Sequence, residues 1–261
     1  MNNIFIRGDL HGDRYEVIRT IAQIDNPTEE DKIIVCGDAG LSYDTWKGTP
    51  AKKEMKKFSG SWIILRGNHD DRYWEKNCYI KYKNEEPTEW IPREGWEITW
   101  NGLYLYEKKY PNILYVYDDG GLYKIGDYNF LFVPGAYSVD KFYRLENKKP
   151  YNFKEQLTLE EQLRLINIVK ECNENNVPID FVIGHTFPLH IEPYYRDLFL
   201  SFIKQSEVDK NTEKFLDVLS KDFEQNIAFK HYFGGHFHDD RRLNDKYTML
   251  YHCLENIKDY I

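Results

Sequence analysis

The sequence is poor in cysteine and has no long apolar run. Its four cysteines among 261 residues are far apart, at Cys36, Cys78, Cys172 and Cys253. None forms a close pair, so the spacing indicates neither a thiolate zinc site nor a disulfide framework. No apolar stretch approaches the ~20 residues of a membrane-spanning helix, and Met1–Ile6 does not begin a signal peptide. We therefore expect a cytoplasmic protein in a reducing setting, with no membrane partner.

Positive charge is also in short supply. Lysine and arginine total 35 against 43 acidic residues, which gives a formal net charge of −8. General nucleic-acid binders carry a basic excess because phosphate contacts dominate their affinity, so we expect no such binding here. The lysine cluster at 52–57 is interpreted as the solvated face of a helix.

Aromatic residues, by contrast, are abundant. The chain has 21 Tyr, 15 Phe and 6 Trp, which excludes a wholly disordered protein and supplies a core. The length suits one large domain, and we predict a single domain over residues 1–261 with a helical insertion at about 187–227.

The N-terminal part alternates predicted strands with predicted helices. Asp13 and Glu16 have the spacing of a capping box, and Thr49-Pro50 begins a second helix. The predicted strands are Ile4–Arg7, Lys32–Cys36 and Trp62–Leu65. This alternation is typical of a largely parallel sheet in an α/β fold.

The rest of the chain is predicted to be richer in strands. Aromatic and β-branched residues alternate with turns over Tyr79–Val133, which indicates a second, mixed or antiparallel sheet. A helix with its own capping box is predicted at Thr158–Cys172. Further helical stretches are expected at Pro193–Gln205 and Thr212–Gln225, and late strands at Ile179–Ile183, Ala228–Phe233 and Tyr247–Tyr251.

Five short polar motifs follow predicted strands. They are Gly8-Asp9-Leu10-His11-Gly12, Gly37-Asp38-Ala39-Gly40, Gly67-Asn68-His69-Asp70, Gly184-His185-Thr186 and Gly235-His236-Phe237-His238. Each motif alone is as easily a turn, or a histidine satisfied within a core. Strand ends of open α/β sheets are nevertheless where ligand groups gather. Together the motifs supply nitrogen and oxygen ligands for two metal ions: Asp9, His11, Asp38, Asn68, His185, His236 and His238.

As a set, these motifs resemble the five blocks of the calcineurin-like metallophosphoesterases, and the segment Gly135–Lys141 resembles a bacterial and phage branch of that family without characterised function. The resemblance runs from residue 8 to residue 238 and implies a fold of two packed mixed β-sheets flanked by helices. It also implies two metal sites that share Asp38. The first would be completed by Asp9, His11 and His238, and the second by Asn68, His185 and His236.

One departure from the family concerns the second block. The protein serine/threonine phosphatase branch has an Asp-Arg-Gly shortly after the shared aspartate, whereas here Asp38 is followed by Ala39-Gly40. The arginine that binds phosphate in that branch is therefore missing from this block. A phosphoprotein phosphatase is accordingly the less favoured alternative.

The ligand set and the resemblance together predict a mechanism. Two divalent ions about 3.5 Å apart would clamp a phosphoryl group, and a bridging hydroxide would attack phosphorus. By resemblance His69 is the general acid for the leaving oxygen, and Asp70 orients it. Mn²⁺ is the first choice of metal, with Fe, Zn²⁺, Ni²⁺ and Co²⁺ as alternatives.

Candidate phosphate-binding cations lie outside the metal motifs. Lys141 and Arg144 are one helical turn apart after the strand ending at Val133, and Arg66 and Arg241 adjoin ligand blocks. The predicted protein is a hydrolase of phosphomonoesters or phosphodiesters acting on a small phosphorylated or nucleotide substrate. A phosphoprotein phosphatase, a nuclease and a metal-bound scaffold without turnover are the alternatives, and the oligomeric state is left open.

Overall fold

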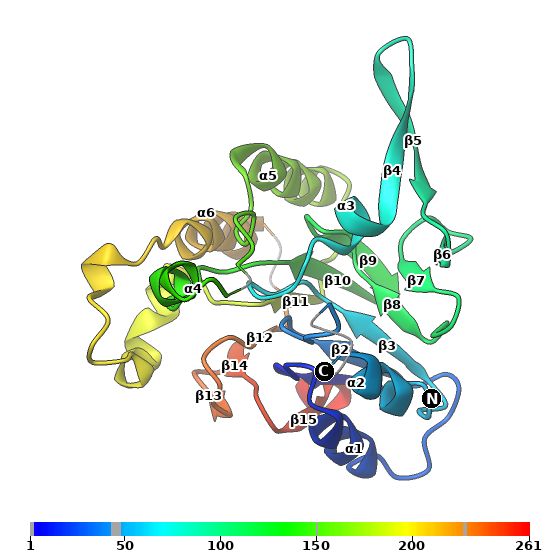
Figure 1. Ribbon diagram of the computed structural model, residues 1–261. Coiled ribbons are helices and arrows are strands. Elements are labelled where there is room, and N and C mark those ends of the chain that lie inside the picture. The colour runs from blue at the N-terminus through cyan, green and yellow to red at the C-terminus, as the bar shows by residue number, and fades with distance from the viewer. Residues whose placement is uncertain (1–2, 43–47, 150, 227–228) are drawn as a thin grey trace.

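Two mixed β-sheets are stacked face to face, with helices on their outer sides (Figure 1). The computed structural model describes residues 3–42, 48–149, 151–226 and 229–261. Within these residues the α/β fold predicted from the sequence is confirmed.

The first sheet has the strand order β15-β1-β2-β3-β8-β7-β6. Its four central strands run parallel: β1 (Ile4–Arg7), β2 (Lys32–Val35), β3 (Ser61–Ile64) and β8 (Ile113–Tyr115). The flanking strands are antiparallel to their neighbours: β15 (Leu254–Asn256), β7 (Leu105–Glu107) and β6 (Trp96–Ile98). Because β1, β2 and β3 are parallel neighbours, the loops that follow them emerge at one edge.

The second sheet has the order β13-β14-β12-β11-β10-β9. Four of its strands run parallel: β10 (Tyr128–Val133), β11 (Phe181–Gly184), β12 (His231–Gly234) and β14 (Tyr247–Met249). Its edge strands β9 (Gly121–Ile125) and β13 (Arg241–Arg242) are antiparallel. A separate hairpin of β4 (Cys78–Lys83) and β5 (Glu86–Pro92) projects from the body of the molecule (Figure 1).

Six α-helices accompany the sheets in the described residues. They are α1 (Arg14–Ala22), α2 (Gly48–Met55), α3 (Tyr73–Asn77), α4 (Lys141–Glu146), α5 (Leu159–Glu174) and α6 (Asn211–Asn226). Short 3₁₀ turns precede α6 at Leu189–Tyr194, Arg196–Leu198 and Gln205–Glu207, and another ends the chain at Ile257–Tyr260. None of the described helices is long and apolar enough to cross a bilayer.

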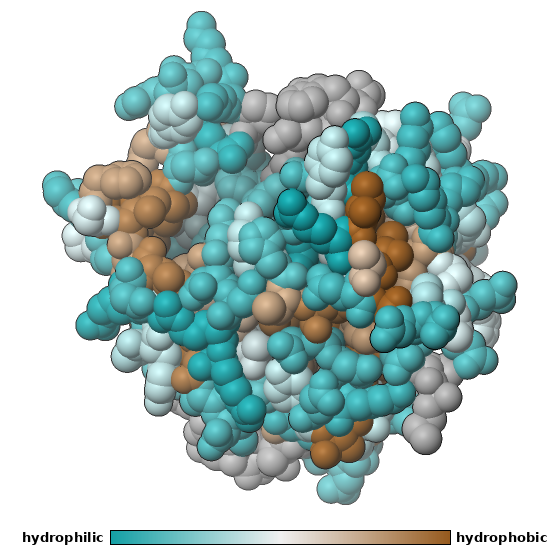
Figure 2. All heavy atoms as spheres, turned by 90° about the horizontal axis from the view of Figure 1, so that it is seen from below, coloured by the Kyte–Doolittle hydropathy of each residue, from teal (hydrophilic) through white to brown (hydrophobic). Residues whose placement is uncertain are grey.

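Three apolar layers hold these elements together. Between the sheets, Ile6 and Ile34 of the first sheet share a buried cluster with Phe132 and Ile183 of the second. On the outer sides, α1 and α2 cover the first sheet, and α5 and α6 cover the second. The face of the molecule seen from below is mainly hydrophilic, with separate hydrophobic patches (Figure 2).

The prediction that Tyr79–Val133 forms the second sheet was wrong in part. Only β9 and β10 join that sheet, because β6, β7 and β8 extend the first sheet and β4–β5 stand apart. An alternating pattern indicates a strand but does not reveal its partner, which packing decides. The stretch Pro193–Gln205 likewise forms 3₁₀ turns and irregular chain rather than a long helix. Residue 228 of one predicted strand lies outside the described residues.

The two predicted capping boxes had different outcomes. Asp13 caps α1 by accepting from the Tyr15 amide, but the Glu16 carboxylate binds Arg7 instead of closing the box. At α5 the box is complete, because Thr158 and Glu161 each accept from the other's backbone N–H.

Glu161 also forms an ion pair with Arg72, and the two contacts together predict how much this side chain stabilises the fold. Its carboxylate also binds the buried Arg72 guanidinium, with 3.0 Å from Nη2 to Oε2. We expect Thr158→Ala to cost about 1 kcal/mol of unfolding free energy through the lost cap. Glu161→Ala should cost about 3 kcal/mol because it also removes the closest partner charge of Arg72, whose other carboxylate, Glu75, lies 3.7 Å away. Urea unfolding measures both, with the exposed neighbour Glu160→Ala as control; equal losses for Thr158 and Glu161 would contradict this account.

Candidate metal centre

Five strands of the two sheets deliver polar side chains to one place. The loops after β1, β2 and β3 come from the first sheet, and those after β11 and β12 come from the second. These are the loops that carry the five motifs predicted from the sequence, and the carboxyl ends of parallel strands are where such folds bind ligands.

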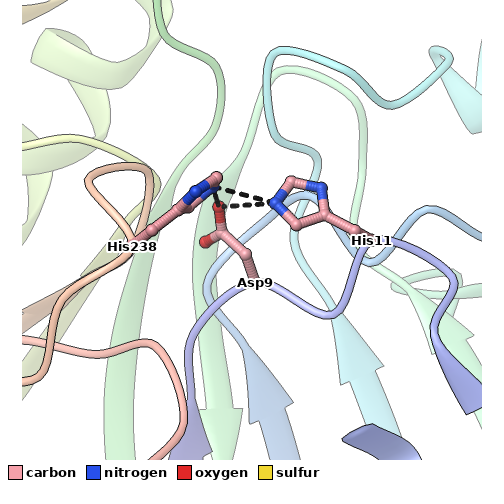
Figure 3. A group of neighbouring side chains, drawn as sticks. All are labelled: Asp9, His11 and His238. Atoms are coloured by element: carbon pink, nitrogen blue, oxygen red, sulfur yellow. Dashed lines mark hydrogen bonds and ion pairs between the residues drawn. The ribbon is translucent and has the colours of Figure 1, made fainter. Parts of the chain in front are cut away.

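A first ligand group consists of Asp9, His11 and His238 (Figure 3). Asp9 Oδ2 lies 3.6 Å from His11 Nε2 and 3.2 Å from His238 Nε2, and the two imidazole nitrogens are 2.9 Å apart. The two histidines are 227 positions apart in the chain, so only the fold brings them together. One carboxylate oxygen and two ring nitrogens thus converge as the ligands of a divalent cation would.

A second ligand group is built around Asp9, Asp38 and His185, whose ligand atoms lie within 4.8 Å of one another. His185 Nδ1 is 2.7 Å from the Cys36 carbonyl, which only accepts, so this nitrogen carries a proton. His185 Nε2 then faces Asp38 Oδ2 at 3.6 Å and Asn68 Oδ1 at 2.7 Å. Without a second proton, His185 Nε2, Asp38 Oδ2 and Asn68 Oδ1 would all be acceptors facing one another. Either a second proton or a cation is therefore needed between them.

The Asn68 amide is held in the orientation that a metal ligand needs. Its Nδ2 donates to Ser138 Oγ at 2.8 Å, which turns Oδ1 toward His185 Nε2 and toward His236 Nδ1 at 3.1 Å. Ser138 is buried and follows β10. It therefore acts on the site by positioning Asn68.

The two carboxylates are buried yet ionised. Burial raises the pKa of Asp9 and of Asp38, but the surrounding imidazoles outweigh it and hold both pKa values below their usual range. Asp9 Oδ1 accepts from the His236 amide, whereas Oδ2 makes no well-aligned hydrogen bond among the described residues. Two buried anions favour a positively charged occupant, and Asp9 Oδ2, which has no well-aligned donor among the described residues, favours it further.

The imidazoles differ in protonation. Burial lowers the pKa of His11 and lowers that of His236 to about 3, so both carry free lone pairs. Burial also opposes charge on His185, but the Asp38 carboxylate more than offsets it and raises the pKa to about 9. Metal ions bind imidazoles in the neutral form. A bound cation would therefore take the place of the second proton on His185, the one at Nε2.

The backbone at the site is strained. Four residues have positive φ: His11 at 49°, Asp38 at 47°, His236 at 71° and His238 at 53°. Such conformations disfavour residues with a Cβ and cluster at functional sites. These backbone conformations direct the four side chains toward the site.

Two glycines let the loops approach the carboxylates. A Cβ at Gly67 would lie 2.1 Å from Asp38 Oδ1, and one at Gly235 would lie 2.2 Å from Asp9 Oδ1. Any side chain at either position would occupy the space of a carboxylate oxygen.

The residues present therefore fit divalent metal ions. Carboxylate, imidazole and amide oxygen donors suit Mn²⁺, Fe, Zn²⁺, Ni²⁺ and Co²⁺, so the donor set does not select one metal. In the geometry Asp9 belongs to both ligand groups. That Asp38 bridges the two metals stays a prediction.

His69 and Asp70 lie beside this centre in different settings. The His69 amide donates to Asp38 Oδ1 at 2.9 Å, and its ring centroid is 6.4 Å from that of His11. Burial lowers the pKa of His69. The Asp70 carboxylate accepts instead from the amides of Gly40 and Gly67 and from the Tyr73 hydroxyl, and burial raises its pKa to about 7. Asp70 thus ties two metal-bearing loops together, and an orienting contact with His69 stays a prediction.

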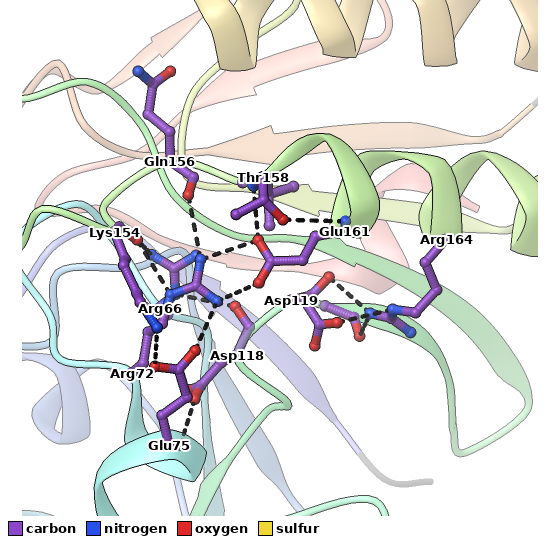
Figure 4. A network of polar contacts seen from close by, with 12 residues as sticks. Arg66, Arg72, Glu75, Asp118, Asp119, Lys154, Gln156, Thr158, Glu161 and Arg164 are labelled. Atoms are coloured by element: carbon purple, nitrogen blue, oxygen red, sulfur yellow. Dashed lines mark hydrogen bonds and ion pairs between the residues drawn. The ribbon is translucent and has the colours of Figure 1, made fainter. Parts of the chain in front are cut away.

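The predicted role of Arg66 in binding substrate does not agree with its position. Its guanidinium is fully buried and donates to the carbonyl oxygens of Asp118 and Glu155 at 3.0 and 2.9 Å. Figure 4 shows it inside a polar network with Arg72 and Glu161. Arg66 joins elements of the fold through Nε and Nη1, and its Nη2 is buried without a hydrogen-bond partner among the described residues.

The other three predicted cations each have partners of their own. Arg144 Nε donates to Asp140 at 2.6 Å, and its positive charge helps lower the pKa of His69. Lys141 Nζ lies over the Tyr137 and Tyr151 rings at 5.7 and 5.5 Å. Arg241 is bound in ion pairs with Asp197 and Asp239. The segment of Lys141 and Arg144 is linked to the metal loops through Ser138, which the sequence analysis had not assigned to the site.

The fold and the ligand geometry together are those of an α/β protein that can hold divalent metal ions where its two sheets meet. The family model of the calcineurin-like phosphoesterases matches residues 3–240, and the chain belongs to that family. A search of the curated proteins finds no match. Among solved structures, the protein of unknown function AQ665 from Aquifex aeolicus is 12% identical, with a TM-score of 0.33 over 70% of this chain and 77% of that one.

Metal content tests the two-site arrangement. Protein saturated with Mn²⁺ should approach two equivalents per chain by elemental analysis. Asp38→Asn should weaken both sites if this carboxylate is shared, whereas His238→Ala should weaken mainly one. A single equivalent at saturating metal would contradict the two-site arrangement.

Ser138 provides a test that spares the ligands. Ser138→Ala removes the acceptor of the Asn68 Nδ2 hydrogen bond and frees the amide to rotate. We expect about 10-fold weaker binding of one ion by calorimetric titration, with the other ion unaffected. Ser138→Thr keeps a hydroxyl and serves as the control; unchanged affinity in the alanine variant would remove Ser138 from the site.

Proposed function

We propose that this protein hydrolyses phosphate esters of small or nucleotide substrates with two divalent metal ions. The observation that carries the proposal is the pair of ligand groups joined through the buried Asp9, with His69 beside them. Family membership already implies a hydrolase of phosphoesters in general. The dinuclear centre and the substrate class are the parts proposed here.

The chemistry of the bound metals would be to polarise the phosphate and lower the pKa of a water molecule. The chain's own residues supply the remaining tasks. Asp9 and Asp38 remain ionised at neutral pH because the imidazoles around them lower their pKa values. The half-buried His69 is the nearest imidazole outside the ligand set, which suits it to give a proton to the leaving oxygen.

Phosphate oxygens would need cations in addition to the metals. The family branch with an arginine in the second block meets this need there, but this chain has Ala39 and Gly40 instead. Arg144 is the best-placed substitute, because its charge is felt at His69 and its segment is held to Asn68 through Ser138. A planar guanidinium can bind two phosphate oxygens at once.

A panel of substrates tests this function. With Mn²⁺ added, we expect turnover of para-nitrophenyl phosphate or its bis ester, and the faster of the two separates monoester from diester chemistry. Activity on phosphopeptides above that on nucleotides would favour the phosphoprotein phosphatase, and cleavage of polynucleotides would favour a nuclease. The absence of turnover on every phosphate ester, in protein with two bound metals, would overturn the proposal.

His69 gives a sharper test of the mechanism. His69→Ala should lower kcat by ~10²–10⁴ for an alkyl phosphate, whose leaving group needs a proton, and by much less for para-nitrophenyl phosphate. Metal content should not change, because the bond from residue 69 to Asp38 comes from the backbone amide. His190→Ala, at an imidazole paired with Asp217, is the matched control. Equal losses on both substrates would mean that His69 positions substrate instead.

A further inference from the structure

A pocket opens directly beside the metal centre. It has a volume of about 240 Å³, and two metal ligands, His236 and His238, form part of its wall. The opposite wall comes from the segment between β11 and α6, including Tyr195 and Phe199. A ligand anchored at the metals can therefore extend into this pocket without leaving the site.

Aromatic rings form one part of the pocket wall. Phe237, between the two metal-ligating histidines, lies 4.4 Å from the Tyr195 ring and 6.3 Å from the Phe199 ring, measured between centroids. The exposed Leu200 and Phe202 follow on the same segment. Figure 2 shows a hydrophobic patch on the side of the molecule where Figure 1 places this segment. Flat aromatic walls favour a planar ring as occupant.

Several polar side chains also line the pocket, among them Glu192, Gln205 and Lys210, and one of the polar groups is buried without a full set of partners. Glu213, at the start of α6, lines the pocket and is only 7% exposed. Its Oε1 accepts from Thr186 Oγ1 at 3.1 Å, whereas its Oε2 is buried without a hydrogen-bond partner in the part of the chain that the structure describes. Burial raises the pKa of Glu213 to about 7. A buried carboxyl oxygen without a donor is costly, so a ligand that supplies an N–H group would gain there.

We infer that this pocket binds a planar nitrogen heterocycle of the substrate, such as a nucleobase, which stacks on the aromatic wall and donates an N–H to Glu213. The inference rests on the proposed function, because the phosphate of the same molecule would lie at the metals. An alkyl chain would also suit the aromatic wall, but it would leave Glu213 Oε2 unpaired.

Matched substrates isolate the heterocycle. Guanosine 5′-monophosphate and ribose 5-phosphate carry the same type of phosphate ester, but only the first has a base with N–H donors. We expect kcat/KM to be at least 10-fold higher for the nucleotide. Glu213→Gln and Phe199→Ala should each reduce that ratio about 10-fold, whereas Phe202→Ala, at an exposed ring on the same segment, should not change it.

Binding of the nucleoside separates this inference from the proposed function. Guanosine lacks phosphate, so its calorimetric titration should show binding that weakens in Glu213→Gln and Phe199→Ala, provided that thermal denaturation shows both variants folded. Guanosine binding without turnover of any phosphate ester would overturn the proposed function and support the pocket. Equal kcat/KM for nucleotide and ribose 5-phosphate without guanosine binding, or a preference for octyl phosphate over the nucleotide, would overturn the pocket.

Discussion

The proximity of two buried carboxylates is the constraint on which the rest of the structure depends. Asp9 and Asp38 are both almost inaccessible, and the charge of Asp38 raises the pKa of Asp9. Buried like charges persist only where positive charge or strong donors surround them. Here the imidazoles of both sheets, including His185, supply that surrounding, and a divalent cation would supply more. The arrangement is costly to a metal-free fold and suited to a metal-binding one.

Residues around the two carboxylates hold the ligand groups in place. Gly67 and Gly235 leave room for the carboxylate oxygens, and Asp70 binds two of the loops together through backbone amides. Ser138 connects the Asn68 loop to the segment after β10. Buried hydrogen bonds of this kind hold ligands in place more rigidly than the loops alone would, because each removes a freedom of rotation.

The second sheet supplies three of the histidines and the aromatic rings on one side of the site. Through its loops it contributes His185, His236 and His238, and the segment between β11 and α6 closes one side with aromatic rings. The metal centre and the apolar pocket thus share the wall formed by the loop after β12. The charged half of a substrate and its organic half would then be recognised by adjacent parts of one surface.

The sequence by itself determined the ligand types, the parallel part of the first sheet and the loops that carry the site, because short motifs after β-type runs are local features. It did not determine which sheet β6, β7 and β8 would join, since alternation is the same beside any partner. Nor did it reveal that Arg66 is enclosed by carbonyl oxygens or that Glu213 lies in the pocket wall. Those properties depend on contacts between distant segments, which only the packing of the two sheets creates.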